Sequence, residues 1–345
     1  MLELLPGPEG LDATTASAVV RTAAQVGGDA GMAVIARFRE DTRLSVQAEF
    51  CHCWSSFDAR CYAETVLSST TPDVYVRVST AEQLAELPRL RHLSRIVLVG
   101  PHGLPTEILE HRNLEWLFRS NDPSLRDLSP LDALPHLTTL VLADCPSVTG
   151  LVPLRGLGIT HLYVHDLAEG MSLAGLDGLA ELRHLTLGFA AGVTDVADIP
   201  VESALTGLVF TRGAERINLH GLERWPELET LMIEGDVQGA QLASQRDETR
   251  LVDLQINSQT ALNPVTLVRH RRLKSLTLSR CLLTTGLAPL KDLPELTSLT
   301  IANAPEPMDL TPLADLENLI VYTRRGVPPA GTEHFPAERL NPRTD

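Results

Sequence analysis

Lysine is almost absent from this chain of 345 residues. Of its 29 lysines and arginines, only Lys274 and Lys291 are lysine. Both follow a leucine, so the Gly-Lys-Ser/Thr core of a nucleotide-binding P-loop is missing. Acidic residues are in excess and give a formal net charge of -15. Nucleic acid and anionic membrane surfaces are poor general partners for a chain of this charge.

Motifs for catalysis are missing too. The chain has no G-x-S-x-G, no H-E-x-x-H and no paired C-x-x-C. Gly156-Leu-Gly158 begins like a dinucleotide fingerprint, but His161 stands where the third glycine belongs. We interpret acid pairs such as Glu223 with Glu227 as solvent-exposed surface residues. The sequence therefore predicts a protein that is not an enzyme and needs no cofactor.

Long apolar runs are also absent, so we expect no membrane span. The first nine residues, MLELLPGPE, have an acid and two prolines where a signal peptide needs a basic and then an apolar region. The cysteines number five, which is odd. These features favour a cytoplasmic protein with reduced thiols.

Three cysteines lie close together around a histidine, in Cys51-His52-Cys53 and Cys61. This group can be read as a zinc cluster. However, structural zinc favours C-x2-4-C pairs, and on a helix Cys51 and Cys53 would point about 200° apart. Free cysteine also packs as a small hydrophobe, so we expect buried thiols and no metal site.

What the chain does contain is a repeat. Residues Leu137 to Leu142, LTTLVL, followed by Cys145, match L-x-x-L-x-L-x-x-N/C, the signature of a leucine-rich repeat. The first apolar position recurs every 20 to 23 residues, at Leu93, Leu114, Leu137, Ile159, Leu182, Leu205, Leu228, Leu251, Leu273, Leu296 and Leu316. Val74 and Val76 form a weaker copy before them. Leucines three apart, as in Leu128-Ser-Pro-Leu131, predict a 3₁₀ turn on the convex side of each repeat.

The fold predicted is an α/β solenoid, a leucine-rich repeat horseshoe of about 11–12 repeats with a parallel sheet on its concave face. Residues 1–70 have a helical period and should form an α-helical cap, with Asp12, Asp29 and Asp58 as N-caps and a third helix starting at Thr42. Phe57 and Tyr62 have the spacing of a hydrophobic staple. Residues 71–325 form the repeats, and residues 326–345 a Pro-rich tail.

Strand side chains alternate, so each repeat places a known residue on the concave face. The central column predicted is Tyr75, Val97, Phe118, Val141, Tyr163, Thr186, Val209, Met232, Gln255, Thr277, Thr300 and Ile320. Its early part is aromatic and apolar, and the stretch from Gln255 to Thr300 is small and polar. Tyr322 also falls at a predicted concave position.

Aromatic residues make up only 4% of the chain, so their gathering on one face favours a binding surface for a protein partner. The candidate ligand-binding residues are Tyr75, Arg95, Trp116, Phe118, Val141, His161, Tyr163, His165 and His184. Strand propensity alone also places aromatics and valine on strands. The three histidines could be metal ligands, a pH switch or solvated strand residues, and the last reading is preferred.

Two stretches resemble the C-terminal region of bacterial NACHT proteins, the NLR-like STAND NTPases. One is Phe50 to Leu67, FCHCWSSFDARCYAETVL, which is similar to the boundary before their repeats; the other is the run of L-S-P-L-x-x-L-P units, as at Leu128 to Leu142. In such proteins an ATP-binding module drives oligomerisation and the repeats sense a ligand or hold the protein inactive. That module is missing here, so no ATPase activity is implied.

The function predicted is non-catalytic protein-protein recognition through the concave repeats, linked to a NACHT-type defence or signalling system. A NACHT NTPase supplied in trans is a possible second partner under the resemblance. The alternative is a structural or autoinhibitory fragment of a split STAND NTPase, which packs against a separate NTPase module.

Overall fold

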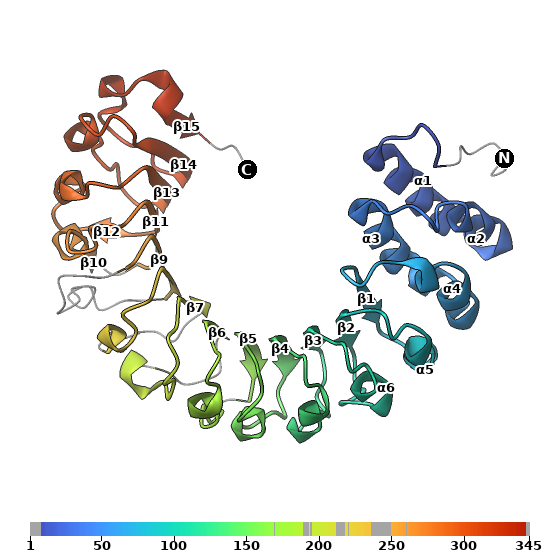
Figure 1. The fold of residues 1–345 in the computed structure, drawn as a ribbon. Helices are drawn as coiled ribbons and strands as arrows, with labels where there is room; N and C mark the ends of the chain where they lie inside the picture. Colours follow the sequence, from blue (N-terminus) through green and yellow to red (C-terminus); the bar gives the residue numbers. More distant parts are fainter. Residues whose placement is uncertain are drawn as a thin grey trace. The chain divides into compact units, whose positions relative to one another are not determined.

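The structure, a computed structural model, describes residues 8–168, 170–188, 193, 195–211, 218–219, 221–235, 250–259 and 261–342. Figure 1 draws the chain as a ribbon coloured along the sequence. The chain divides into two compact units. Unit 1 comprises residues 1–149 and 156–159, and unit 2 comprises residues 150–155 and 160–345. No helix in the described ranges is long and apolar enough to cross a membrane.

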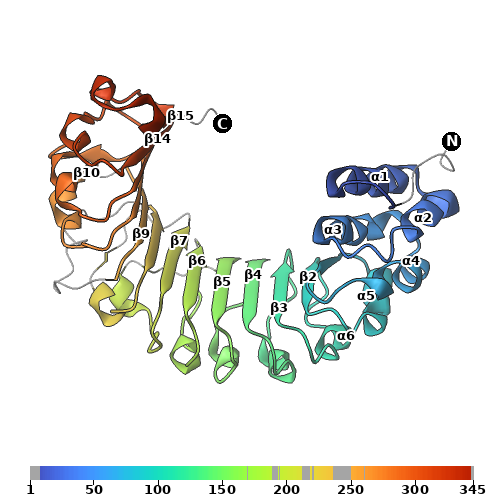
Figure 2. The same ribbon diagram turned by 45° about the horizontal axis from the view of Figure 1, so that its top comes forward.

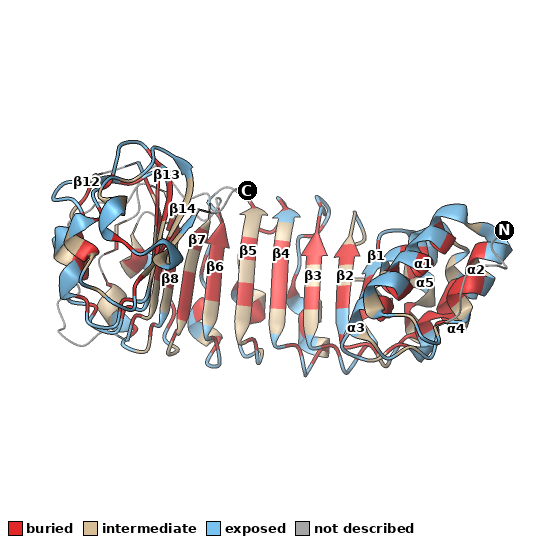
Figure 3. Ribbon diagram, turned by 90° about the horizontal axis from the view of Figure 1, so that it is seen from above, coloured by how far each residue is buried: buried red, intermediate tan, exposed pale blue. Residues whose placement is uncertain are grey.

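Unit 1 begins with helices, as predicted. They are α1 (Ala13–Val26), α2 (Gly28–Ala36), α3 (Leu44–Cys53), the 3₁₀ turn η2 (Trp54–Ser56), α4 (Ala59–Thr65) and the turn η3 (Leu67–Ser69). Their core includes Val20, Ile35, Phe50 and Trp54. The buried parts of these helices are red in Figure 3.

Of the three predicted N-caps, Asp12 and Asp58 are confirmed. The prediction for Asp29 is wrong, because α2 begins at Gly28 with Gly27 as its N-cap, so Asp29 lies inside the first turn. Asp12 accepts a hydrogen bond from the backbone N–H of Thr15 at 2.8 Å, and Asp58 accepts one from Cys61 at 2.8 Å. The ring of Phe57 stacks on that of Tyr62 with centroids 4.9 Å apart. The third helix starts at Leu44, two residues later than predicted.

Four parallel strands complete unit 1: β1 (Tyr75–Val78), β2 (Arg95–Val99), β3 (Trp116–Ser120) and β4 (Thr139–Cys145). The returning segments are short and helical, namely α5 (Ala81–Glu86), η4 (Leu87–Arg89), α6 (Thr106–Leu109) and η5 (Ser129–Ala133). Leucines from strand and turn, such as Leu117 and Leu131, meet in the interior of each coil and are fully buried. Burial of these faces between neighbouring coils stabilises the stack.

Unit 2 repeats the same coil (Figure 2). Its nine parallel strands in the described ranges are β5 (His161–Leu167), β6 (His184–Gly188), β7 (Gly207–Thr211), β8 (Thr230–Glu234), β9 (Asp253–Asn257), β11 (Ser275–Ser279), β13 (Ser298–Ala304), β14 (Ile320–Gly326) and β15 (Leu340–Pro342). A short pair, β10 (Ala261–Leu262) and β12 (Leu282–Leu283), lies outside this sheet.

The returning segments of unit 2 are 3₁₀ turns, as the leucine spacing predicted. They are η6 (Val152–Leu154), η7 (Leu176–Gly178), η8 (Val196–Asp198), η9 (Leu222–Arg224), η10 (Pro264–Leu267), η11 (Ala288–Asp292), η12 (Thr311–Leu313), η13 (Thr332–His334) and η14 (Ala337–Arg339). The turns cover one face of the strands and leave the other uncovered, here called the open face (Figure 1). The predicted leucine-rich repeat solenoid with an N-terminal helical segment is confirmed.

The register corrects the predicted central column at both ends. Tyr75 pairs with Arg95, because the first coil is two residues shorter than assumed. At the other end Tyr322, instead of Ile320, pairs with Thr300. A shift of two residues preserves the alternation of side chains, so all these residues still belong to the open face.

The segment predicted as a tail contains a further coil. Strand β15 pairs with β14, with Leu340 opposite Val321. The Arg339 guanidinium donates hydrogen bonds to the carbonyls of Leu316 and Ala314 at 2.6 and 3.0 Å. These bonds tie residues 337–342 to the preceding coil.

Candidate ligand-binding faces

The open face of unit 1 carries a cluster of three aromatic rings. The Tyr75 and Trp116 ring centroids lie 6.3 Å apart, and those of Trp116 and Phe118 lie 6.1 Å apart, both in tilted orientations. Tyr75 is 40% exposed. We call these three residues, together with His52, the aromatic row.

His52 was not among the predicted site residues. It is exposed at the end of α3, and its Nε2 lies 3.2 Å from the Tyr75 hydroxyl. The buried stripe of α3 contains Val46, Phe50 and Cys53, which already placed His52 off the core face. Its contact with Tyr75 joins a helix to a strand 23 residues away, and no sequence spacing reports such a contact.

Arg95 and Val141 complete the predicted residues of unit 1. Arg95 is exposed and stands in register between Tyr75 and Trp116. Val141 pairs with Phe118 but is only 8% exposed, so it supports the ring of its neighbour and offers little surface itself.

The four predicted residues of unit 2 lie on β5 and β6. The His161 and His184 rings are stacked, with centroids 4.5 Å apart. Burial, and then the charge of the neighbouring His161, lower the pKa of His184. Tyr163 is half-buried on the same open face, in register with Thr186.

Two strand glycines make room for these histidine rings. A side chain at Gly207 would overlap the ring of His184, and a Cβ at Gly188 would lie 2.6 Å from His165 Nδ1. The Thr211 hydroxyl also lies 3.3 Å from His165 Nδ1. The rings therefore lie along the sheet, over the neighbouring strands, and a glycine inside a strand was the sequence signal for this close approach.

No group of three or more His, Cys, Asp or Glu side chains in the described ranges is placed to hold a metal ion. Cys51 and Cys53 are buried, and burial raises the pKa of each thiol to about 12. Both thiols are therefore protonated at neutral pH, which is unfavourable for metal binding.

A pocket of about 320 Å³ lies on the open face of unit 2 and includes the small polar residues predicted there, from Gln255 to Thr300. It is lined by Met232, Ile233, Glu234, Gln255, Ile256, Asn257, Thr277, Ser279, Thr300, Ala302, Asn303, Arg324 and Arg325. Five strands, β8, β9, β11, β13 and β14, contribute to it. We call it the polar pocket.

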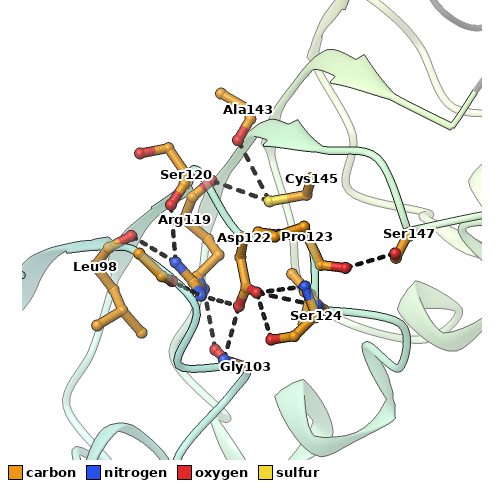
Figure 4. Close-up of polar contacts among 12 residues, drawn as sticks. Leu98, Gly103, Arg119, Ser120, Asp122, Pro123, Ser124, Ala143, Cys145 and Ser147 are labelled. Carbon is orange, nitrogen blue, oxygen red and sulfur yellow. Dashed lines mark hydrogen bonds and ion pairs between the residues drawn. The ribbon is translucent and has the colours of Figure 1, made fainter. Parts of the chain in front are cut away.

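A buried ion pair lies beneath the end of β3 in unit 1 (Figure 4). Arg119 occupies the inward position that Leu98 and Leu142 occupy in the flanking strands. Its guanidinium pairs with Asp122, and both side chains are fully buried. It also donates to the carbonyls of Leu98 and Gly103, each at 3.0 Å.

Asp122 is held by backbone donors from both sides of the turn. It accepts hydrogen bonds from the N–H groups of Gly103 at 2.7 Å, Ser124 at 2.8 Å and Leu125 at 3.1 Å. Burial raises the pKa of Asp122, but hydrogen bonds from Ser124 and Gly103 and the charge of Arg119 outweigh it and keep this pKa below its usual value. The cluster fixes residues 100–105 and is structural.

These features define the chain as a leucine-rich repeat solenoid. No protein-family model matches the sequence, and no curated protein sequence does. Among solved structures, Toll of Drosophila in its complex with Spätzle matches with a TM-score of 0.58 and 16% identity, over 77% of this chain and 37% of that one. This chain therefore spans little more than a third of the Toll chain.

Two further similar structures are an internalin of Listeria monocytogenes and the ectodomain of a membrane receptor kinase from Arabidopsis thaliana. The internalin has a TM-score of 0.47 and 16% identity, over 78% of this chain and 94% of that one. The plant ectodomain has a TM-score of 0.49 and 17% identity, over 81% and 34%. At these identities the similarity extends to the fold alone.

Proposed function

We propose that this protein is a non-catalytic recognition module that binds a protein partner through the open face of unit 1. The observation that carries this proposal is the aromatic row. Three rings gather on one face of a chain that is only 4% aromatic, and aromatic and arginine side chains dominate the energetics of protein interfaces. The solved Toll structure is a complex with Spätzle, which agrees with a binding role for a repeat solenoid.

The charges around the aromatic row define the partner's chemistry. Arg95 stands between Tyr75 and Trp116, and Arg77 is exposed on the same strand as Tyr75. The matching surface is an apolar or aromatic side chain flanked by carboxylates. Such a partner gains contact with the rings and pairs its acids with Arg77 and Arg95.

The test is affinity capture from host extract with the full chain, followed by titration of the purified partner. The double variant W116A/F118A should weaken the complex at least tenfold, since central aromatic residues of an interface are worth about 2 kcal/mol or more each. Tyr322→Ala, an aromatic on the open face of unit 2, is the matched control. Equal affinity of wild type and W116A/F118A for the captured partner would refute the proposal.

A second candidate function rests on the resemblance of Phe50 to Leu67 to the boundary before NACHT-protein repeats. In that function the solenoid packs against a separate STAND NTPase and restrains it. Much of the motif has a local structural role, however: Trp54 Nε1 donates to the carbonyl of Ala59 at 2.9 Å, and the Tyr62 hydroxyl donates to that of Phe50 at 3.0 Å. The test of this candidate is co-expression with a NACHT NTPase encoded by a neighbouring gene. The candidate predicts a stable complex of the two proteins, and the W116A/F118A variant should form the same complex.

We also propose a cytoplasmic setting. The five cysteines are all free, and four of them are buried. Fractionation of the host with an antibody against the chain tests this assignment, and recovery in an exported fraction would contradict it.

A further inference from the structure

The polar pocket of unit 2 shares no residue with the aromatic row. Its volume of about 320 Å³ matches the smaller ligand sites of proteins, which measure roughly 300–1,000 Å³. The strand register explains its form. Met232, Gln255, Thr277 and Thr300 are paired in one row across β8 to β13, and Glu234, Asn257 and Ser279 are paired in the next.

Six of the thirteen lining residues carry a hydroxyl or an amide group. Gln255, Thr277 and Thr300 come from one row, and Asn257, Ser279 and Asn303 lie beside them. These groups both donate and accept hydrogen bonds. Among the described residues the lining has no aromatic side chain, and its apolar members are Met232, Ala302 and two isoleucines. Such a surface suits a ligand with several hydroxyl groups.

The positive charge of the pocket is concentrated at the end formed by β14. Arg324 and Arg325 line the pocket from β14. The acidic residue of the lining, Glu234, is on β8, roughly 19 Å away across four strand spacings. An anion at the β14 end would therefore meet arginines and lie far from the carboxylate.

Arg324 also has an unused donor. Its Nε is buried and has no hydrogen-bond partner in the described part of the chain. Buried polar groups of native proteins are nearly always paired, so this donor indicates an acceptor that enters the pocket. A guanidinium offers its N–H groups in a fork that matches the oxygens of a carboxylate or a phosphate.

We propose that the polar pocket binds a small polyhydroxylated anion. Its carboxylate or phosphate pairs with Arg324, and its hydroxyl groups bond to Gln255, Thr277 and Thr300. This site does not depend on the recognition role of unit 1.

The test is isothermal titration of the full chain with four probes: glucose 6-phosphate, gluconate, glucose and inorganic phosphate. At least one of the two charged sugars should bind, and glucose should bind at least tenfold more weakly. Arg324→Ala should weaken binding of the charged sugar at least tenfold, because a hydrogen bond to an ionised group is lost. Arg324→Lys should recover only part of the binding that Arg324→Ala loses, since lysine lacks the forked N–H groups of a guanidinium.

Arg272→Ala is the matched control, because Arg272 is exposed and is not part of the lining. W116A/F118A should also leave sugar binding unchanged, which separates this test from that of the recognition surface. Circular dichroism confirms that each variant is folded.

Three results would overturn the proposal. One is the absence of binding by both charged sugars up to about 10 mM, a concentration that detects even millimolar sites. Another is an equal loss in Arg272→Ala and Arg324→Ala, which would indicate general surface charge. The third is inorganic phosphate binding as tightly as glucose 6-phosphate, which would remove the role of the hydroxyl row.

Discussion

Replacing Asp122 with alanine should destabilise unit 1 by about 3–5 kcal/mol, the usual cost of breaking a buried ion pair. The substitution leaves the Arg119 guanidinium buried without its counter-charge. It also removes the acceptor of the Gly103, Ser124 and Leu125 N–H groups. Arg119→Leu in the same chain should recover part of the loss, because leucine is the residue that Leu98 and Leu142 place at the same position.

Urea unfolding followed by tryptophan fluorescence measures this effect. In a Trp225→Phe background, the remaining tryptophans are Trp54 and Trp116, both in unit 1, so the signal reports that unit. Asp127→Ala is the control, because Asp127 accepts a hydrogen bond from the Ser129 N–H but is exposed. A loss of less than about 1 kcal/mol in Asp122→Ala, the size of one ordinary hydrogen bond, would refute the account of this cluster.

The same pair sets a dependence on pH. The pKa of Asp122 is lower in the folded protein than its usual value of about 3.9. The carboxylate therefore contributes its stability above about pH 4, and this contribution is lost as the pH falls through the lower folded-state value. Wild type should lose more stability than Asp122→Ala when urea unfolding is repeated from pH 5 down to pH 2.5. Parallel losses in the two proteins would show that Asp122 does not carry this dependence.

Two further predictions concern the histidines and the thiols. Gly207→Val should destabilise the protein by about 1–3 kcal/mol through overlap with the His184 ring, and His184→Ala in the same chain should relieve most of it; melting curves that show no such rescue would contradict the packing. Iodoacetamide at pH 8 should modify the exposed Cys61 and spare Cys51 and Cys53, which are buried and have a raised pKa. Peptide mass spectrometry checks this order of reaction.

The repeat itself was predictable because one spacing recurs. A strand leucine must meet a turn leucine in every coil, so the pattern is copied and visible along the sequence. The caps at Asp12 and Asp58 were predictable for a similar reason, since an N-cap acts only on the following turn. Features that depend only on residues close together in the chain can therefore be predicted from the sequence.

The remaining features depend on contacts between coils or between elements. Arg119 stands at an inward position where the repeat calls for leucine, and its partner lies in the following turn. The contact of His52 with Tyr75 and the polar pocket both need the strand register, which slips by two residues at Tyr75 and at Tyr322. The nearly constant repeat length does not reveal these two-residue shifts in strand register, because the side chains stay on the same face.

Hydrogen exchange on the full chain with its captured partner tests the central claim most directly. Binding through the open face of unit 1 predicts slower exchange in β1, β2 and β3, at residues 75–78, 95–99 and 116–120, and at the end of α3 near His52. Protection confined to the returning segments α5, α6 and η5, with these strands unchanged, would contradict it.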